Sequence, residues 1–210
     1  MIKILIVDDH PLIRDGIKQI LATETDMVVA GEARSASELM EKLKKEKFNL
    51  VILDISLPDG NGLDVLKKLK REYSNLPVLV LSMHQEEEYA IRALKSGAAG
   101  YIVKETASSQ LVGAIRKVAS GGKYISPALA EQLADCMEEG FNETPHQTLS
   151  DRELQILLMI GSGKTPTEIA KTLCLSIKTI STYRARILEK MRMENNSQLM
   201  HYVLKHNLRT

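Results

Sequence analysis

The sequence predicts a two-domain protein, in which a doubly wound α/β domain with a (βα)5 parallel sheet precedes a small all-α domain of four helices. Short apolar runs alternate with segments of helical spacing up to about residue 120. Polar residues follow several of these runs directly. The remaining chain is basic and carries repeated helix-start signals.

The five apolar runs that we interpret as strands are Ile4–Val7, Met27–Ala30, Leu50–Leu53, Val78–Leu81 and Tyr101–Val103. The segments of helical spacing between and after them are Leu12–Ala22, Ala36–Lys45, Leu63–Glu72, Glu87–Lys95 and Ser108–Ser120. Unbroken apolar runs suit strands that are buried on both faces, and right-handed crossovers then give a parallel sheet with helices on both sides. Ser35 and Glu38 predict a capping box at the start of the second helix.

The composition is that of a globular protein and not of a membrane or secreted one. The chain has 210 residues, of which 44% are hydrophobic and 26% charged, as in ordinary globular proteins. No apolar run approaches the roughly 20 residues of a membrane span, and the N-terminus turns acidic too early for a signal peptide. We therefore expect a cytoplasmic protein with no membrane partner. Cys136 and Cys174 lack metal-site spacing and are expected to be buried small side chains.

Charge is divided unevenly along the chain. Residues 149–210 carry ten Lys and Arg against five Asp and Glu, a net charge of +5, whereas residues 1–148 have a net charge of −4. This division indicates a control domain joined to a domain that binds a polyanion.

Polar residues gather at the carboxyl ends of the predicted strands. Asp8 and Asp9 follow the first strand, Asp54 the third, Ser82 the fourth and Lys104 the fifth. In a parallel sheet these positions share one edge, where three carboxylates would repel one another unless a cation such as Mg²⁺ intervened. A carboxylate beside Mg²⁺, a lysine and a hydroxyl can accept a phosphoryl group as an acyl phosphate. The alternative is that Asp54 only caps its loop.

These positions resemble the receiver domain of bacterial two-component response regulators over about residues 1–120. Ser82 and Lys104 lie 28 and 50 residues after Asp54, and Tyr101 occupies the position of an aromatic switch residue. The resemblance implies a flavodoxin-like or CheY-like fold and phosphorylation of Asp54 by a sensor histidine kinase. It also implies that Lys104 and Ser82 bind the phosphoryl group. The implied Mg²⁺ ligands are Asp8, Asp9, Asp54 and the backbone carbonyl of Ser56.

Four positions depart from the receiver pattern or leave alternatives open. Ser82 stands where Thr is more frequent, and Glu105 stands where many receivers have a proline in a cis peptide, so the Lys104–Glu105 bond is either trans or held cis by its surroundings. His84 lies where family members tune phosphoryl lifetime, or it is a surface histidine. Tyr101 is either a mobile switch or a half-buried core aromatic, while Lys104 is expected to pair with Asp54 at rest.

The pattern breaks after Gly121 and Gly122. We expect a receiver over residues 1–121, a linker over 122–147 and a DNA-binding domain over 148–210. Ser126 and Pro127 predict a linker helix with Leu129, Leu133 and Met137 on one face.

Capping signals divide the C-terminal domain into four helices. Ser150 with Glu153 and Thr165 with Glu168 are two capping boxes, the second with Pro166 in the first turn. The third helix is expected to begin at Ser176, and the fourth at Asn195, Asn196 and Ser197. Because only Cys174, Leu175 and Ser176 separate the second and third helices, they form a helix-turn-helix.

The third of these helices is the candidate recognition helix. Its outward stripe has small, hydroxylated or charged residues that suit entry into a major groove: Lys178, Ser181, Thr182, Ala185 and Glu189. Thr179 and Tyr183 lie beside this stripe, and Arg184, Arg186 and Lys190 are positioned to reach phosphates. The alternative is a solvated basic face. Residues 148–209 resemble the LuxR-type DNA-binding domain of NarL/FixJ response regulators, and the STYR segment resembles their GacA/UvrY branch.

The resemblance implies a transcription regulator that dimerises through its last helix, Ser197–His206, on a two-fold operator. Pro166 and Tyr183 depart from the usual residues and indicate a different operator rather than lost DNA binding. Two rival functions stay open. The first is an enzyme, either a Mg²⁺-dependent phosphatase or a protein that binds a nucleotide or flavin. The phosphatase would need an acid where Ser56 stands, and the nucleotide or flavin site would need glycines that the DDHPLI segment lacks, so we do not expect an enzyme. The other rival is an interaction module that works without phosphorylation.

Overall fold

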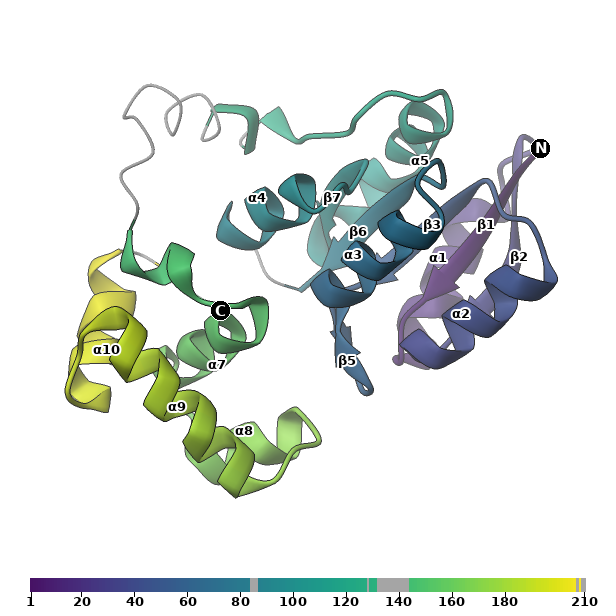
Figure 1. Ribbon diagram of the computed structural model, residues 1–210. Helices are drawn as coiled ribbons and strands as arrows, with labels where there is room; N and C mark the ends of the chain where they lie inside the picture. Colours follow the sequence, from purple (N-terminus) through teal and green to yellow (C-terminus); the bar gives the residue numbers. More distant parts are fainter. Residues whose placement is uncertain (84–86, 128, 132–143, 207, 209–210) are drawn as a thin grey trace. The chain divides into compact units, whose positions relative to one another are not determined.

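The computed structural model describes residues 1–83, 87–127, 129–131, 144–206 and 208 (Figure 1). The chain forms two compact units, Met1–Ala134 and Asp135–Thr210. The limits expected for the receiver, the linker and the DNA-binding domain stay predictions.

The N-terminal unit is built on a five-stranded parallel sheet of order β2-β1-β3-β6-β7. Its strands are β1 (Ile2–Val7), β2 (Met27–Ala33), β3 (Leu50–Asp54), β6 (Val78–Ser82) and β7 (Gly100–Val103). Every residue of β3 and β6 is buried, because both faces of these central strands are covered. The predicted (βα)5 fold is confirmed.

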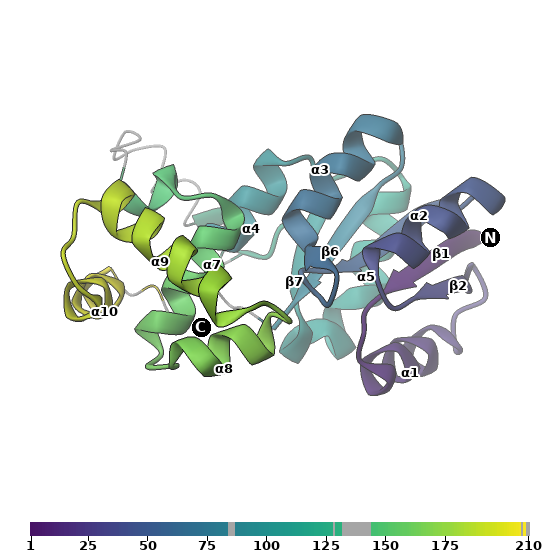
Figure 2. The same cartoon turned by 60° about the horizontal axis from the view of Figure 1, so that its bottom comes forward.

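Helices cover both faces of this sheet. They are α1 (Pro11–Leu21), α2 (Ala36–Lys45), α3 (Gly62–Glu72), α4 (Glu87–Lys95) and α5 (Ala107–Ala119), with a 3-10 turn η1 (Lys104–Thr106) before α5. Figures 1 and 2 show α1 and α5 on one face, with α2 and α3 on the other. Ile4 and Ile6 of β1 belong to the hydrophobic core that includes Ile17 of α1 and Leu111 of α5. Strand alternation therefore assigns successive residues to opposite helix layers.

The second helix begins with half of the predicted capping box. The Ser35 hydroxyl accepts a hydrogen bond from the Glu38 amide, as expected. The Glu38 carboxylate, however, accepts from the amide of Arg34 at 2.8 Å rather than from that of Ser35. The N-cap prediction is thus confirmed, whereas the reciprocal bond of a capping box is not found.

A short hairpin, which the sequence analysis treated only as a tight loop, follows β3. Its strands are β4 (Ser56–Leu57) and β5 (Gly60–Asn61), which pair antiparallel. The chain then turns back so closely that the amide of Gly62 donates to the carbonyl of Ile55 at 2.8 Å. A Cβ at Gly62 would lie 2.5 Å from the carbonyl oxygen of Asp54 and overlap the Ile55 backbone, so only glycine fits there.

Part of the predicted linker packs as a continuation of the N-terminal unit. Tyr124 forms a parallel bridge with Gly100, and its amide donates to the carbonyl of Ala99 at 2.8 Å. The Ser126 hydroxyl accepts from the amide of Leu129 at 3.3 Å, consistent with the predicted helix start. Leu133 and Met137, which were expected to continue that helix, lie outside the described residues.

The C-terminal unit consists of the four expected helices preceded by a 3-10 turn. The elements are η2 (Pro145–Thr148), α7 (Asp151–Gly161), α8 (Pro166–Thr172), α9 (Ile177–Met191) and α10 (Asn196–Lys205). Both predicted capping boxes are confirmed, at Ser150 and at Thr165, and Ser176 caps α9. The all-α C-terminal domain is therefore also confirmed.

Two features of this unit were not anticipated. Cys174 was expected to be buried, but its side chain is exposed, and its φ of 52° places it in the left-handed region that ends the turn after α8. His146 lies in the expected linker, yet it is buried and its Nδ1 lies 2.8 Å from the Tyr202 hydroxyl of α10. The end of the expected linker is thus part of the helical core.

The close approach at Gly62 predicts a contrast between two glycine substitutions. Gly62→Ala should lower the free energy of unfolding of the N-terminal unit by about 1–3 kcal/mol, because its Cβ must displace backbone. Gly16→Ala is the control, because that α1 position has no atom within 4 Å of the added Cβ and should gain about 0.5–1 kcal/mol in helix propensity. Urea unfolding of both variants measures the difference, and equal effects would contradict the steric argument.

Candidate functional site

Three carboxylates meet at the carboxyl edge of the sheet, as predicted. β1 and β3 are neighbours with Val7 opposite Leu53, so the residues that follow them come together. Asp8, Asp9 and Asp54, with His10, each offer a ligand atom, and these atoms all lie within 4.8 Å of one another. Asp8 and Asp54 are each 1% exposed. Strand pairing thus brings two buried carboxylates together with the partly exposed Asp9.

Lys104 carries the positive charge of this cluster. It follows β7, two strands away from β3, and its long side chain reaches back to the centre of the sheet edge. Its Nζ lies 2.7 Å from Oδ2 of Asp8 and 2.7 Å from Oδ2 of Asp54. The predicted Asp54 pair is present, and the contact with Asp8 is an addition to it.

Burial has the largest effect on the pKa values of Asp54 and Lys104. Burial raises the pKa of Asp54 to about 6, with a smaller rise from the Asp8 charge that opposes the lowering by Lys104. For Lys104, burial lowers the pKa, but the charges of Asp54 and Asp8 outweigh it and raise the pKa above its ordinary value. Two buried carboxylates facing one ammonium therefore leave an excess of negative charge.

The donor set fits Mg²⁺. Oδ2 of Asp8 and Oδ1 of Asp9 are buried, and each lies 2.7 Å from one nitrogen, Lys104 Nζ and His10 Nδ1 respectively. Carboxylate oxygens are the hard ligands that Mg²⁺ prefers, and each has more than one lone pair to offer. The cluster thus has both the charge and the oxygen ligands for a divalent cation.

The hairpin after β3 is held in place at two points. The Ser56 amide donates to Oδ1 of Asp54 at 3.1 Å. At the hairpin tip, Asp59 accepts from the amides of Ala36 and Ser37 at 2.8 and 3.0 Å and from the Ser37 hydroxyl at 3.0 Å. The segment that carries Ser56 is therefore tied to the start of α2, but the role of the Ser56 carbonyl stays a prediction.

The remaining predicted receiver residues lie on the strands beside this cluster. Ser82 is the fully buried last residue of β6, opposite Val103 of β7. Tyr101 of β7 is also buried, at 5% exposure, rather than half-buried. The Lys104–Glu105 peptide is trans. His84, the predicted modulator of phosphoryl lifetime, lies outside the described residues.

Two residues beside the acidic cluster were not identified from the sequence. His10 donates its amide to Oδ1 of Asp8 at 2.8 Å, and its ring lies beside Asp9. Arg14 donates to the backbone carbonyl of Asp8 at 2.7 Å. The position of His10 directly after two acids was a usable signal, whereas Arg14 on α1 carried none.

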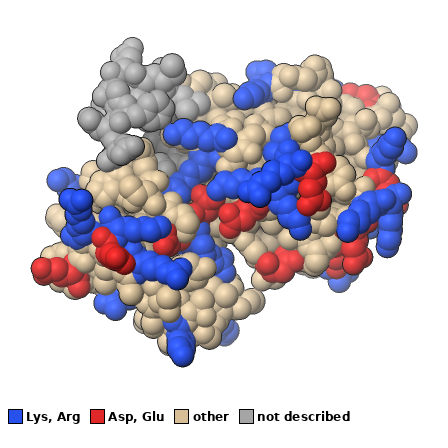
Figure 3. Space-filling view, viewed as in Figure 1, with Lys and Arg blue, Asp and Glu red and all other residues tan. Residues whose placement is uncertain are grey.

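The candidate DNA-binding surface is the outward face of α9. Exposed side chains on it include Lys178, Ser181, Thr182, Ala185 and Arg186, and Thr179 and Tyr183 are partly exposed. The Ser181 and Thr182 hydroxyls donate to carbonyls one turn back, Ile177 and Lys178, so their oxygen atoms still face outward as acceptors. Figure 3 shows basic side chains across this helical unit, with fewer acidic ones.

Two predicted phosphate ligands are already engaged within the unit. Nζ of Lys190 lies 2.6 Å from Glu153, a buried acid of α7. Nε of Arg184 donates to the Asn196 side chain at 2.5 Å. In this state Lys190 and Arg184 join helices, and their predicted phosphate contacts would require these bonds to be exchanged. Lys178 and Arg186 have no such intramolecular partner among the described residues.

No helix in the described part of the chain is both long and apolar enough to cross a membrane.

Comparison with known families accounts for both units. Residues 4–116 match the response regulator receiver domain, and residues 147–203 match the bacterial regulatory proteins of the luxR family. The chain is similar to the response regulator GacA of Pseudomonas syringae pv. syringae, with 38% identity across 99% of this chain and 98% of the relative. It is 36% identical to the response regulator UvrY of Escherichia coli K12, across 99% of this chain and 96% of that protein.

Solved structures of the RcsB response regulator from Salmonella typhimurium resemble the chain over its length. One has a TM-score of 0.71 at 28% identity and covers 97% of each chain. Another, RcsB from Salmonella enterica serovar Typhimurium bound to the promoter rprA with the phosphomimetic BeF3−, has a TM-score of 0.66 at 27% identity, covering 96% of this chain and 97% of that one.

The raised pKa of Asp54 predicts how stability depends on pH without metal. Because the folded state holds the proton more tightly, this group stabilises the fold below about pH 4, and that stabilisation is lost as pH rises through about 6. In EDTA at pH 8, Asp54→Asn should be more stable than wild type by up to about 3 kcal/mol, and the difference should vanish near pH 4. Urea unfolding at both pH values tests this. Mg²⁺ at pH 8 should stabilise wild type more than the variant, and a pH-independent difference would refute the argument.

Proposed function

The chain belongs to the response regulators, in which a receiver domain controls a LuxR-type DNA-binding domain, and we propose that Asp54 is its phosphoryl acceptor. As a member, it is a transcription regulator of a two-component system. The observation that carries the assignment to Asp54 is the pair of 2.7 Å contacts from Lys104 to Asp8 and Asp54 in one buried cluster.

In the proposed reaction, an Asp54 carboxylate oxygen attacks the phosphorus of a kinase phosphohistidine. The bond between phosphorus and the histidine nitrogen breaks as the acyl phosphate forms, and the nitrogen takes back its electron pair. Asp8 and Asp9, with Asp54 and the Ser56 carbonyl, would hold Mg²⁺. When bound, Mg²⁺ neutralises charge on the transferred group. The receiver domain implies a sensor histidine kinase as the partner that donates the phosphoryl group.

The residues beside Asp54 then convert phosphorylation into a change of state. Lys104 exchanges an Asp54 oxygen for a phosphoryl oxygen, and the Ser82 hydroxyl donates to another. Tyr101, buried on the neighbouring strand, follows Ser82. These contacts exist only in the phosphorylated form, so they shift the population toward the active state.

The output is binding of a two-fold DNA site by a homodimer, with α9 in the major groove. Support comes from the exposed basic and hydroxylated face of α9 and from similarity to RcsB, whose complexes with DNA are known. We propose dimer contact through α10 and action in the cytoplasm, without turnover of a separate substrate. A phosphatase assay that found turnover would support the rival enzymatic function.

The acceptor assignment predicts the outcome of a labelling experiment. Asp54→Ala should incorporate no radioactive phosphoryl group from a phosphorylated kinase or from acetyl phosphate, because the attacking carboxylate is absent. Wild type should acquire a label that hydroxylamine removes, as expected of an acyl phosphate. Asp59→Ala controls for loss of a nearby carboxylate and should still be labelled. Stable labelling of Asp54→Ala would refute the assignment.

The DNA-binding assignment predicts two different binding defects. Lys178→Ala should weaken binding to specific and scrambled duplexes alike and reduce the slope of log affinity against log salt by about 1, because it removes a phosphate contact. Thr182→Ala should change base preference, by about 1–3 kcal/mol at one position. Gel-shift titrations measure both, with Lys44→Ala in α2 as a charge control. Identical behaviour of the two variants would overturn their separate roles.

A further inference from the structure

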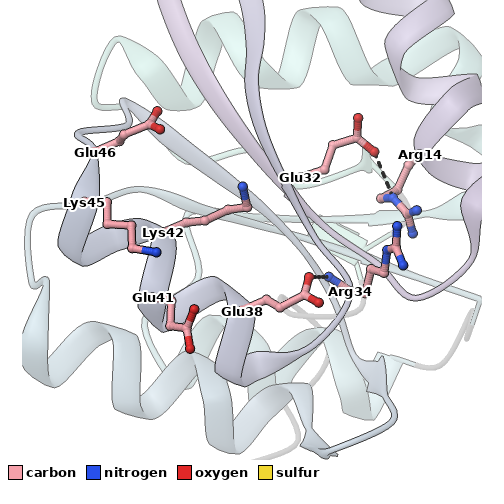
Figure 4. A pocket seen from close by; sticks show the side chains of 8 residues that line it. All are labelled: Arg14, Glu32, Arg34, Glu38, Glu41, Lys42, Lys45 and Glu46. Atoms are coloured by element: carbon pink, nitrogen blue, oxygen red, sulfur yellow. Dashed lines mark hydrogen bonds and ion pairs between the residues drawn. The ribbon is translucent and has the colours of Figure 1, made fainter.

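Arg14 is a buried cation behind the acidic cluster. It lies on α1, only 6% of its surface is exposed, and its guanidinium has two separate acceptors. Nη1 donates to the backbone carbonyl of Asp8 at 2.7 Å, and Nε donates to the Glu32 carboxylate of β2 at 2.9 Å. Figure 4 shows the bond between Arg14 and Glu32 at the edge of a charged pocket. A buried guanidinium is costly unless such acceptors are fixed in place.

These bonds fix the backbone of Asp8 from both sides. The Asp8 amide donates to the carbonyl of Ala33 at the end of β2, at 3.1 Å. Its carbonyl accepts from Arg14, whose own position is set by Glu32, one residue before Ala33. β1 and β2 are paired through this register, with Ile6 opposite Glu32. The peptide that carries the first acid of the cluster is therefore held between β2 and α1.

Lys18 provides an internal comparison. Its Nζ lies 2.9 Å from the other oxygen of Glu32, so Glu32 accepts from both cations. No hydrogen bond or ion pair joins Lys18 to Asp8 among the described residues, and Lys18 lies nearer the surface, with 40% of its side chain exposed. Loss of Lys18 therefore removes a partner of Glu32 but leaves the Asp8 carbonyl paired, whereas loss of Arg14 removes both bonds.

We propose that Arg14 is a positioning residue, which orients Asp8 for Mg²⁺ and thereby sets the metal affinity of the receiver. The inference rests on the proposed function, because it assigns a support to the same site. The bonds of Arg14 go to Glu32 and to the backbone of Asp8, so it would act on the metal site through Asp8. A guanidinium is suited to the task because its planar fork donates in fixed directions, whereas an ammonium group is a point charge with rotatable donors on a flexible stem. Groups that orient metal ligands typically change affinity by 10–100-fold.

The test compares Arg14→Met and Arg14→Lys with the matched control Lys18→Met in the full-length, unphosphorylated chain. Calorimetric titration with MgCl2 measures the Kd for Mg²⁺. We expect about a tenfold or larger increase in Kd for Arg14→Met, a smaller increase for Arg14→Lys, and a change within twofold for Lys18→Met. Urea unfolding in EDTA shows whether each variant is folded. If Arg14→Met does not fold, Arg14→Lys is compared with Lys18→Met instead.

A second readout does not need the metal. The His10 amide donates to Oδ1 of Asp8 at 2.8 Å, so its exchange with deuterium in EDTA reports whether Asp8 keeps its orientation. Exchange should be faster in the Arg14 variants and unchanged in Lys18→Met. Equal effects of Lys18→Met and Arg14→Met on Kd and on exchange would overturn the inference, as would unchanged values in the Arg14 variants.

If the proposed function is wrong, these measurements give a different pattern from the one expected if only the inference is wrong. A wild-type chain that binds no Mg²⁺ and takes no label on Asp54 would refute that function, while His10 exchange would still decide whether Arg14 orients Asp8. A labelled wild type with unaltered Arg14 variants would refute only the inference.

Discussion

Two buried carboxylates share one ammonium group, and this contact determines the charge of the site in the N-terminal unit. Lys104 lies 2.7 Å from both Asp8 and Asp54, so the metal-free cluster holds more negative than positive charge in a buried site. Both carboxylates are placed at the ends of β1 and β3, which are paired with a strand on each side. The same imbalance favours a divalent cation. Burial, with a smaller contribution from the Asp8 charge, raises the pKa of Asp54 although a lysine touches it.

Sequence reasoning located this site because strand ends in a parallel sheet share an edge, a relation that needs only the order of apolar runs. It also predicted the helix starts at Ser150, Thr165 and Ser176, which depend on residues three positions apart. The bond from Arg14 to Asp8 depends instead on how α1 lies over β1 and β2, which sequence spacing does not reveal. Asp8 as a second partner of Lys104 was missed for the same reason.

In the helical unit, one acidic side chain makes two structural contacts. Glu153 completes the capping box at the start of α7, and it also pairs with Lys190 near the end of α9. Hydrogen bonds and the Lys190 charge lower its pKa despite burial. This contact holds α9 against α7, the first helix of the same unit. Spacing alone could not show this partner of Lys190, and its phosphate contact stays a prediction.

The contact between Asp59 and the start of α2 constrains how the receiver can evolve. Asp59 closes the N-terminus of a helix that begins 23 residues earlier in the chain. The tip of the hairpin after β3 and the first turn of α2 are thus joined by three hydrogen bonds to one carboxylate. An insertion into the hairpin or into the loop before α2 would separate the carboxylate from its donors, so we infer that these two connections can change length only together.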